Sequence, residues 1–374
     1  MPSIADVPRC GQGEAAGCVD FFAPERGFGA RFVLGYHVTA TPNAGAVMRR
    51  VFYTTPDPDP ARTVEVLDVD EPRCPDAGVL VAVEARPINP ADLLLLTGRH
   101  VFTPTLPATV GIEGAGRVIA AGPTSRLRPG DVVGIPRGGT WSERLAFEDD
   151  EVLRLPAGVD IEQAAMLCVN PFTAVGLLEG VAEGATIVLN AGTSAVSRLV
   201  LSLARRRGLR ALAVVRDARS EDELLALGAA AVVVDGDDLA QRLRHAAGTP
   251  IVRGLDAVAG AASGRLFDSI AEGGDLIVYG LLSSSKVELP AANLVFRDVT
   301  VRGYSRLRCY AAMSPERRAE IGAELVALLS SGDAITPIAA RYPLERAAEA
   351  IAHHERPGRQ GKILLVSPPA LPLR

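Results

Sequence analysis

The sequence predicts an α/β protein that combines a doubly wound parallel sheet with a β-rich, barrel-like domain. Two observations lead to this prediction. From about residue 160 the chain alternates between strand and helix patterns, which is typical of consecutive βαβ units. Residues 51–150 instead carry short strand patterns separated by Gly and Pro turns, which favour a barrel-like domain.

The β-rich domain is assigned to residues 49–165, and residues 306–374 are expected to return and complete it. Its expected strands lie at 63–69, 78–85, 116–122 and 129–134. Residues 1–48 are rich in Gly, Ala and Pro and lack sustained periodicity, so we expect a flexible extension there. A start codon assigned upstream of Met48 is the alternative explanation for this segment.

The alternating part is assigned to residues 166–305 as a dinucleotide-binding domain. Its expected strands lie at 185–190, 211–215, 231–234, 255–258 and 275–279, and its expected helices at 161–180, 195–207 and 220–227. The helix at 195–207 places its apolar residues on one face, as a helix that covers a sheet requires. Ligands bind such sheets outside the carboxyl ends of the strands, so we expect the site there.

Composition excludes several classes of partner. The chain has 374 residues, and its net charge of −5 gives no reason to expect nucleic acid or an acidic membrane. No apolar run reaches the roughly 18 residues of a membrane span, and no signal-peptide pattern is present. The five cysteines form no CxxC pair and suggest no disulfide framework. We therefore expect a small-molecule substrate and a cytoplasmic protein.

A turn of small residues after the strand 185–190 is the first candidate site. The turn and the start of the next helix consist of Gly192, Thr193, Ser194, Ala195 and Val196. Small residues let backbone N–H groups approach a pyrophosphate, and the helix dipole favours its charge. Ala195 and Ser197 stand where glycines are usual in this type of turn, so an ordinary tight turn remains the alternative interpretation.

The end of the second strand indicates the form of the cofactor. An acid at this position binds the ribose 2′-hydroxyl of NAD, whereas an arginine pairs with the 2′-phosphate of NADP. Arg216 follows the strand 211–215 and is the principal NADP determinant, with Arg219 as a further candidate. Asp217 favours NAD if the register differs by one residue, and a solvated loop arginine is the other alternative.

Four motifs link these regions to a known family. They are Ile88–Leu93, Gly111–Gly116, Pro129–Val133 and Gly358–Ile363. In sequence and spacing they resemble the medium-chain dehydrogenase/reductase superfamily over residues 51–367. The resemblance implies a Rossmann-type nucleotide-binding domain and a GroES-like barrel.

Zinc-dependent members of this superfamily have a cysteine where Asn89 stands and a histidine where Ile112 stands. Neither residue can serve as that ligand, and the chain lacks the four closely spaced cysteines of a structural zinc site. We therefore predict that no metal is bound. The resemblance then points to the zinc-free branch, which contains quinone oxidoreductases and enoyl reductases.

Within that branch, three passages resemble the mitochondrial-type 2-enoyl thioester reductases. They are Gly139–Trp141, Cys168–Ala174 and Val214–Asp217. The resemblance implies that Asn89 and Thr173 lie near the nicotinamide and Lys362 near the cofactor phosphates or ribose, and we add Tyr279 to the cofactor set. The structural alternatives are a turn asparagine, a threonine bonded to its own helix and a surface lysine.

One position departs from that family. Its thioester reductases carry a tyrosine shortly after Gly98 that protonates or orients the substrate, whereas His100 stands at or near that position here. A histidine can act as a general acid because its pKa lies near working pH. His100 and Asn89 are therefore the catalytic candidates, and an exposed loop histidine is the alternative for His100.

The resemblance implies an NADPH-dependent reductase that transfers hydride to an activated carbon–carbon double bond, in a 2-enoyl thioester or a similar enone. An NADPH:quinone oxidoreductase is the first alternative, because it needs no dedicated proton donor. A non-catalytic NADPH-binding module is the alternative of another class. We also expect a homodimer joined through edge strands of the nucleotide-binding domain, with Asp275–Tyr279 and Val287–Leu294 as the expected interface.

Overall fold

The computed structural model describes residues 42–100, 103–332 and 335–369. Most of the expected N-terminal extension therefore lies outside the described residues. The first strand, β1 (Pro42–Tyr53), starts before residue 49, where strand patterning begins in the sequence. It pairs antiparallel with β2 (Val64–Pro72) at Pro42 and Asn43 and again from Val47 onwards, with a register shift between Asn43 and Val47. The strand thus begins in a segment whose sequence carries no strand pattern.

Six parallel strands form one sheet in the order β11-β10-β9-β12-β13-β14. Their bounds are β9 (Thr186–Leu189), β10 (Arg210–Val215), β11 (Ala229–Val234), β12 (Ile251–Asp256), β13 (Asp275–Val278) and β14 (Thr300–Gly303). The direction of winding reverses between β9 and β12, so the predicted doubly wound sheet is confirmed. Ligands bind outside the carboxyl ends of the strands at such a reversal.

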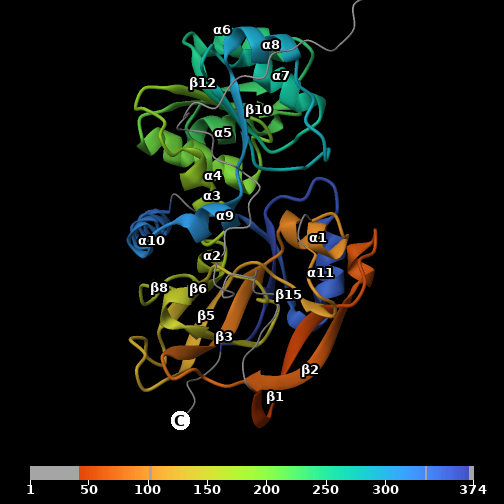
Figure 1. Cartoon of the computed structure of the whole chain (residues 1–374), viewed down its shortest axis with the longest axis vertical. Coiled ribbons are helices and arrows are strands. Elements are labelled where there is room, and N and C mark those ends of the chain that lie inside the picture. Colours follow the sequence, from red (N-terminus) through yellow and green to blue (C-terminus); the bar gives the residue numbers. More distant parts are fainter. Residues whose placement is uncertain (1–41, 101–102, 333–334, 370–374) are drawn as a thin grey trace, which may run out of the picture. The chain divides into compact units, whose positions relative to one another are not determined.

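Helices cover both faces of this sheet (Figure 1). One face is covered by α4 (Ala195–Arg206) and α5 (Glu221–Leu227), the other by α6 (Leu239–Ala247) and α7 (Ala261–Ser269). The side chains of β9 alternate accordingly, with Ile187 and Leu189 packed toward α4 and Val188 packed toward α6 and α7. Because both faces are buried, the strand is a continuous apolar run, which explains why the sequence identified it.

A seven-stranded sheet forms the β-rich part, in the order β15-β16-β3-β5-β6-β8 with β7 also paired to β3. Its strands are β3 (Gly78–Pro87), β5 (Gly114–Ala121), β6 (Val132–Ile135), β7 (Arg144–Glu148), β8 (Leu153–Leu155), β15 (Ile338–Pro343) and β16 (Lys362–Val366). A smaller sheet has the order β2-β1-β4, where β4 is Ala108–Thr109. The C-terminal strand β16 pairs with β3, Leu365 opposite Arg86, so residues 362–366 lie in the same sheet as β3.

The remaining helices are short except one. They are α1 (Pro90–Leu96), α2 (Ile161–Ala164), α3 (Asn170–Leu177), α8 (Ala291–Arg297), α9 (Arg306–Ala312), α10 (Pro315–Ser330) and α11 (Ala347–His354). Within the described ranges, none of the helices is both long and apolar enough to cross a membrane.

The single helix expected at 161–180 is wrong, because α2 ends at Ala164 and α3 begins at Asn170. Pro171 lies in the first turn of α3, where the missing proline N–H leaves no backbone hydrogen bond unmade. Inside a continuous helix the same proline would remove such a bond and clash with the preceding turn. The proline therefore marks the start of a new helix.

The expectation that Asp275–Tyr279 forms a sheet edge is also wrong. β13 pairs with β12 on one side and with β14 on the other, so it is an inner strand.

The strand expected at 255–258, β12, starts earlier, at Ile251. Arg253 interrupts its apolar pattern, but the guanidinium of Arg253 pairs with Asp275 on the neighbouring strand at 2.7 Å, so a charged residue is accommodated there.

Candidate functional site

The turn between β9 and α4 lies close against β10. The N–H of Gly192 donates to the carbonyl of Val214 at 2.9 Å. A Cβ at Gly192 would lie 3.0 Å from Val215 Cγ1 and 3.1 Å from Val214 O, closer than ordinary van der Waals contact. Glycine therefore allows this approach of the turn to the strand without displacing β10.

Two serines close the same turn. Ser194 caps α4, because its Oγ accepts from the N–H of Ser197 at 3.2 Å and donates to Ser197 Oγ at 2.9 Å. Ser197 Oγ donates to the carbonyl of Asn190 at 3.2 Å, and Ser197 is fully buried. Ser197 thus stands where a glycine is usual, and its hydroxyl makes its hydrogen bonds within the turn.

The start of α4 is suited to an anion. The helix has twelve residues, and its N-terminal N–H groups and dipole favour negative charge at that end. Thr193 is exposed, and Ala195 and Val196 are half-buried at this end. The five residues expected to bind the pyrophosphate therefore all lie at one turn, at the carboxyl end of β9.

A buried carboxylate joins the carboxyl ends of β9 and β12. Asp256 is fully buried and accepts from Asn190 Nδ2 at 2.6 Å and from Ser263 Oγ at 2.5 Å. It also accepts from the N–H groups of Val258 and Ala259 at 2.9 and 3.1 Å. These bonds lock the two strands together at the point where the winding of the sheet reverses.

The residues after β10 distinguish the two candidate arginines. Arg219 Nε and Nη2 each donate to a carboxylate oxygen of Asp217 at 2.8 Å, and this hydrogen bonding lowers the pKa of Asp217 to about 2. Arg216 is exposed and makes no hydrogen bond or ion pair with another described residue. Arg216 is therefore available to a phosphate, whereas the charge of Arg219 is already balanced by Asp217.

Tyr279 directly follows β13 and has a buried hydroxyl. Burial raises the pKa of Tyr279 to about 12, and the neighbouring hydroxyls of Ser197 and Ser194, which are placed for weak hydrogen bonds only, oppose that shift. A weakly bonded hydroxyl of this kind can donate to a ligand atom at the same turn, which is consistent with the prediction that Tyr279 contacts the cofactor.

A second buried cluster joins four segments that are distant in the sequence. Lys362, the first residue of β16, donates to Asn89 Oδ1 at the start of α1. Asn89 Nδ2 donates to Glu113 Oε1 at 3.0 Å, and Glu113 Oε2 accepts from the N–H of Val169 at 2.8 Å. The exposed fraction is 6% for Lys362, 2% for Asn89 and zero for Glu113. Two residues expected at the cofactor site are therefore in direct contact.

Burial is the main influence on the pKa values of this cluster. It lowers the pKa of Lys362 to about 8, and the carboxyl groups of Glu113 and Asp92 oppose that shift. Burial raises the pKa of Glu113, opposed by Lys362, and raises the pKa of Asp92 to about 7. Asp92 Oδ2 accepts from the N–H of Asn89 at 2.8 Å. Lys362 thus lies beside two buried carboxyl groups whose negative charge favours its protonated form.

Thr173 and His100 lie on different elements of the fold. Thr173 in α3 is buried, and its hydroxyl donates to the carbonyl of Val169 at 2.7 Å, which is a bond within its own helix. His100 follows α1, is partly buried, and donates its N–H to Leu94 O at 3.0 Å. Residues 101–102 lie outside the described residues. The contacts of both side chains with a cofactor or substrate remain predictions.

The positions that hold zinc in other members of the superfamily have different surroundings here. The Asn89 amide is bonded to Lys362 and Glu113, and Ile112 packs in an apolar cluster with Val110 and Trp141. Over residues 42–100, 103–332 and 335–369, no group of three or more His, Cys, Asp or Glu side chains is arranged to hold a metal.

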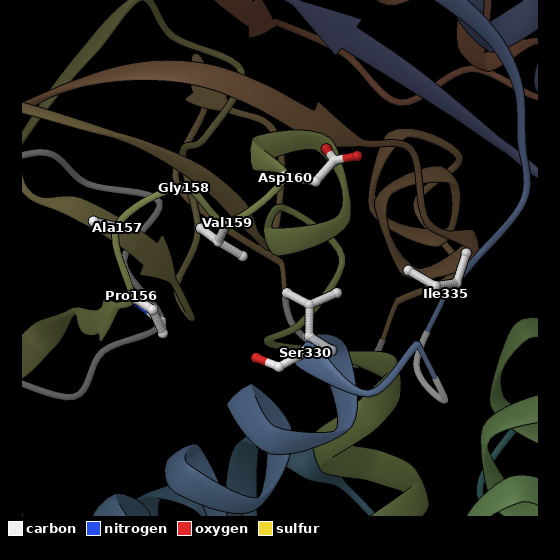
Figure 2. A pocket seen from close by; sticks show the side chains of 8 residues that line it. Pro156, Ala157, Gly158, Val159, Asp160, Ser330 and Ile335 are labelled. Atoms are coloured by element: carbon white, nitrogen blue, oxygen red, sulfur yellow. The ribbon is translucent and has the colours of Figure 1, made fainter.

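Figure 2 shows a shallow pocket in another part of the fold. It has a volume of about 270 Å³ and lies between residues 156–160, the end of α10 and Ile335. The Asp160 carboxylate accepts from the N–H of Glu162 at 2.9 Å, and the Ser330 hydroxyl donates to Val326 O at 2.9 Å. Both polar side chains of the pocket are thus bonded within their own helices, and the pocket is not part of the candidate site.

Sequence reasoning missed three buried acids, Glu113, Asp92 and Asp256. The first two lie inside motifs that carry the family resemblance, and Asp256 ends a buried strand. An acid within an apolar or glycine-rich segment is the signal that identifies such residues, because a carboxylate is rarely buried without a partner.

Both parts of the chain match family models. Residues 75–157 match the model described as alcohol dehydrogenase GroES-like domain. Residues 195–321 match the model described as zinc-binding dehydrogenase. The predicted combination of a GroES-like part with a Rossmann-type part is therefore supported by both matches.

The chain is also similar to individual proteins. It is 31% identical to the mitochondrial enoyl-[acyl-carrier-protein] reductase of Homo sapiens over 320 residues, which cover 82% of this chain and 86% of the relative. A solved structure from Bacillus thuringiensis, assigned as an NADPH:quinone reductase, has a TM-score of 0.80 and 26% identity over 86% of this chain and 100% of that chain. A mutant form of the Candida tropicalis enoyl thioester reductase, at 22% identity, shares the fold, with a TM-score of 0.76 over 86% of this chain and 100% of that chain.

Replacing Asp256 by alanine should destabilise the protein. Four donors would lose their common acceptor, so we expect the free energy of unfolding to fall by about 3 kcal/mol. Denaturant unfolding followed by circular dichroism measures this. Asp237→Ala, which removes an exposed acid after β11, is the control and should change the value by less than about 0.5 kcal/mol. Equal stability of the two variants would contradict the role given to Asp256.

Proposed function

Since the chain belongs to the medium-chain dehydrogenase/reductase family, we propose that it reduces an activated carbon–carbon double bond with NADPH, in a 2-enoyl thioester or a similar enone. The observation that carries this proposal is the buried contact between Lys362 and Asn89. A cation and an amide meet at the position where zinc-dependent members have a metal ligand. Similarity to an enoyl-[acyl-carrier-protein] reductase over most of both chains supports the same reaction class.

The residues at the carboxyl ends of β9, β10 and β13 fit NADPH. Gly192 allows a close turn, the start of α4 favours a pyrophosphate, and Arg216 is available to a 2′-phosphate. The weakly bonded hydroxyl of Tyr279 adds a donor at the same turn. When bound, NADPH would supply the hydride for the acceptor's β-carbon.

The protein's own residues would then stabilise the charge that develops on the acceptor and supply the proton. Reduction of a conjugated bond leaves negative charge on the carbonyl oxygen of the acceptor. Hydrogen bonds near Asn89 would stabilise this enolate, because donors in a buried site are not screened by water. His100 or water would supply the proton at the α-carbon.

A quinone is the second candidate acceptor. The similarity to the Bacillus thuringiensis protein favours it, and so does His100 in place of the expected tyrosine, since quinone reduction needs no dedicated donor of a proton to carbon. We also propose a small-molecule substrate, with neither nucleic acid nor an acidic membrane as partner, because the net charge of −5 gives no reason to expect either.

We also infer that the protein is a homodimer joined at β14. Among the described strands, β14 pairs with β13 alone, which leaves its other edge open. The preceding helix α8 exposes Val295 by 71% and Phe296 by 80%. An open strand edge beside exposed apolar side chains is a surface that a second copy would cover.

Turnover tests the proposed reaction. The protein should consume NADPH with a short trans-2-enoyl thioester, and His100→Ala should lower kcat by about 100-fold or more if His100 donates the proton. His245→Ala, in an exposed position on α6, is the matched control and should retain kcat. Turnover of a 1,4-quinone alone would favour the second candidate, and full thioester activity of His100→Ala would exclude His100 as the donor.

The cofactor preference tests Arg216. Arg216→Ala removes a charge-assisted bond to the 2′-phosphate, so the Kd for NADPH should rise about 10- to 100-fold while the Kd for NADH stays constant. Arg219→Ala should have a smaller effect because Asp217 already pairs with that arginine. Fluorescence titration measures both constants. A native protein that prefers NADH would contradict the assignment.

The oligomeric state tests the interface. Phe296→Glu places a charge in the proposed contact and should convert the dimer to a monomer in size-exclusion chromatography with light scattering. Leu225→Glu makes the same type of change on α5, where the leucine is 41% exposed, and should leave the dimer intact. A native protein that elutes as a monomer, or a dimer that survives Phe296→Glu, would argue against this interface.

A further inference from the structure

The orientation of the Asn89 amide follows from the chemistry of its two neighbours. An ammonium group only donates hydrogen bonds and a carboxylate only accepts them. Lys362 must therefore face Asn89 Oδ1, and Glu113 must face Asn89 Nδ2, as the contacts show. We propose that Glu113 is a positioning residue that, through Asn89, holds the Lys362 ammonium in place for the cofactor. This inference rests on the proposed function, in which Lys362 contacts the cofactor.

Glu113 is fixed in the fold by hydrogen bonds from two other segments. It immediately precedes β5, and both of its carboxylate oxygens are engaged, Oε1 by Asn89 and Oε2 by the N–H of Val169 ahead of α3. Its side chain has no exposed surface. The carboxylate therefore connects the segments before β5 and α3 to the start of α1, and its position leaves Asn89 one orientation.

Asp92 does not perform this task. Its Oδ2 accepts from the backbone N–H of Asn89, and the backbone N–H of Gly111 also favours its charged form. Asp92 thus caps α1 and makes no hydrogen bond to the Asn89 side chain. Removal of Asp92 would change the backbone cap, whereas removal of the Glu113 charge would release the amide.

The contact between Lys362 and Asn89 also determines which of the two residues can donate hydrogen bonds to a ligand. One N–H of Asn89 is directed to Glu113. Lys362 uses one of its three donors on Asn89 and carries the positive charge. A negatively charged ligand therefore gains most from Lys362, and Asn89 holds that ammonium while its second N–H stays available to the enolate.

The charged groups around the cluster determine its response to pH. Lys362 is influenced by Glu113, Asp92 and Arg359, and His354 also lies near it; Arg306 lies near Glu113. Burial lowers the pKa of His354 to about 3, so His354 is neutral at working pH. Glu113 and Asp92 are the groups that favour the charged lysine, and loss of the Glu113 charge should lower the pKa of Lys362 further.

The experiment is a fluorescence titration of NADPH binding across pH with the full-length protein. In the wild type the cationic form of Lys362 predominates below its pKa, so affinity should decline as pH rises through about 8. Glu113→Gln should move that decline to lower pH by about one unit or more, because an attractive charge is removed. Glu84→Gln is the matched control, since Glu84 is a buried glutamate of β3 that pairs with Arg117, and it should keep the wild-type pH dependence.

A charge-preserving variant covers the case in which Glu113→Gln does not fold. Glu113→Asp keeps the charge but shortens the reach to Asn89 and Val169. It should keep the wild-type pH dependence and weaken NADPH binding by about tenfold, which is the loss of one charged hydrogen bond. Wild-type affinity in this variant, or an unchanged pH dependence in folded Glu113→Gln, would overturn the inference.

The outcomes for the two proposals can be told apart. A wild-type protein that binds no NADPH at any pH contradicts the proposed function. A wild-type protein that binds NADPH without a decline near pH 8 contradicts the role of Lys362 in this inference, whether or not enoyl thioesters are reduced.

Discussion

The buried guanidinium of Arg86 holds together the segments on which the Lys362 cluster depends. Arg86 has no exposed surface, and burial lowers its pKa to about 9. It donates to the carbonyls of Val83 and Ser142 at 2.7 Å, and to Ser367 Oγ at 3.0 Å. A buried cation is tolerated only when its N–H groups find acceptors. The loop around Ser142 and the end of β16 must therefore lie against β3.

The register of β16 follows from the same contact. Leu365 lies opposite Arg86, and the N–H of Ile88 donates to the carbonyl of Ile363 at 3.0 Å. Continued by one residue, this antiparallel register places Lys362 opposite Asn89. A shift by one residue would turn the lysine to the other face of the sheet. The cofactor cluster thus depends on strand pairing outside it.

The two halves of the candidate site are constructed by the same physical means. In each, a fully buried acid accepts hydrogen bonds from segments that are separate in the sequence, Asp256 at the reversal of the parallel sheet and Glu113 beside Lys362. Such an acid is stable only while its donors surround it. Each acid therefore orients its neighbours closely, which is what binding a charged cofactor and stabilising an enolate require.

Local sequence determined the elements and the nucleotide turn. The apolar run of β9, the amphipathic α4 and the small residues between them lie within about twenty consecutive residues, and their pattern predicted a pyrophosphate site that the turn geometry supports. Arg216 at the end of β10 could likewise be identified from the sequence, because its predicted role at the 2′-phosphate depends only on its position directly after a strand. The same patterns misplaced the starts of two strands. β12 starts at Ile251 although the charged Arg253 interrupts its apolar pattern, and β1 starts at Pro42 in a segment without a strand pattern.

Tertiary structure alone decided which distant residues meet. Asn89 and Lys362 were expected near a cofactor through resemblance, yet nothing in either segment indicated that they touch, and Glu113 was noted only as part of a family motif. These residues are separated by up to 273 positions, and their contact depends on the pairing of β16 with β3. Hydrophobic period and turn composition are properties of short segments, whereas a buried hydrogen bond between remote side chains depends on the topology that brings their strands together.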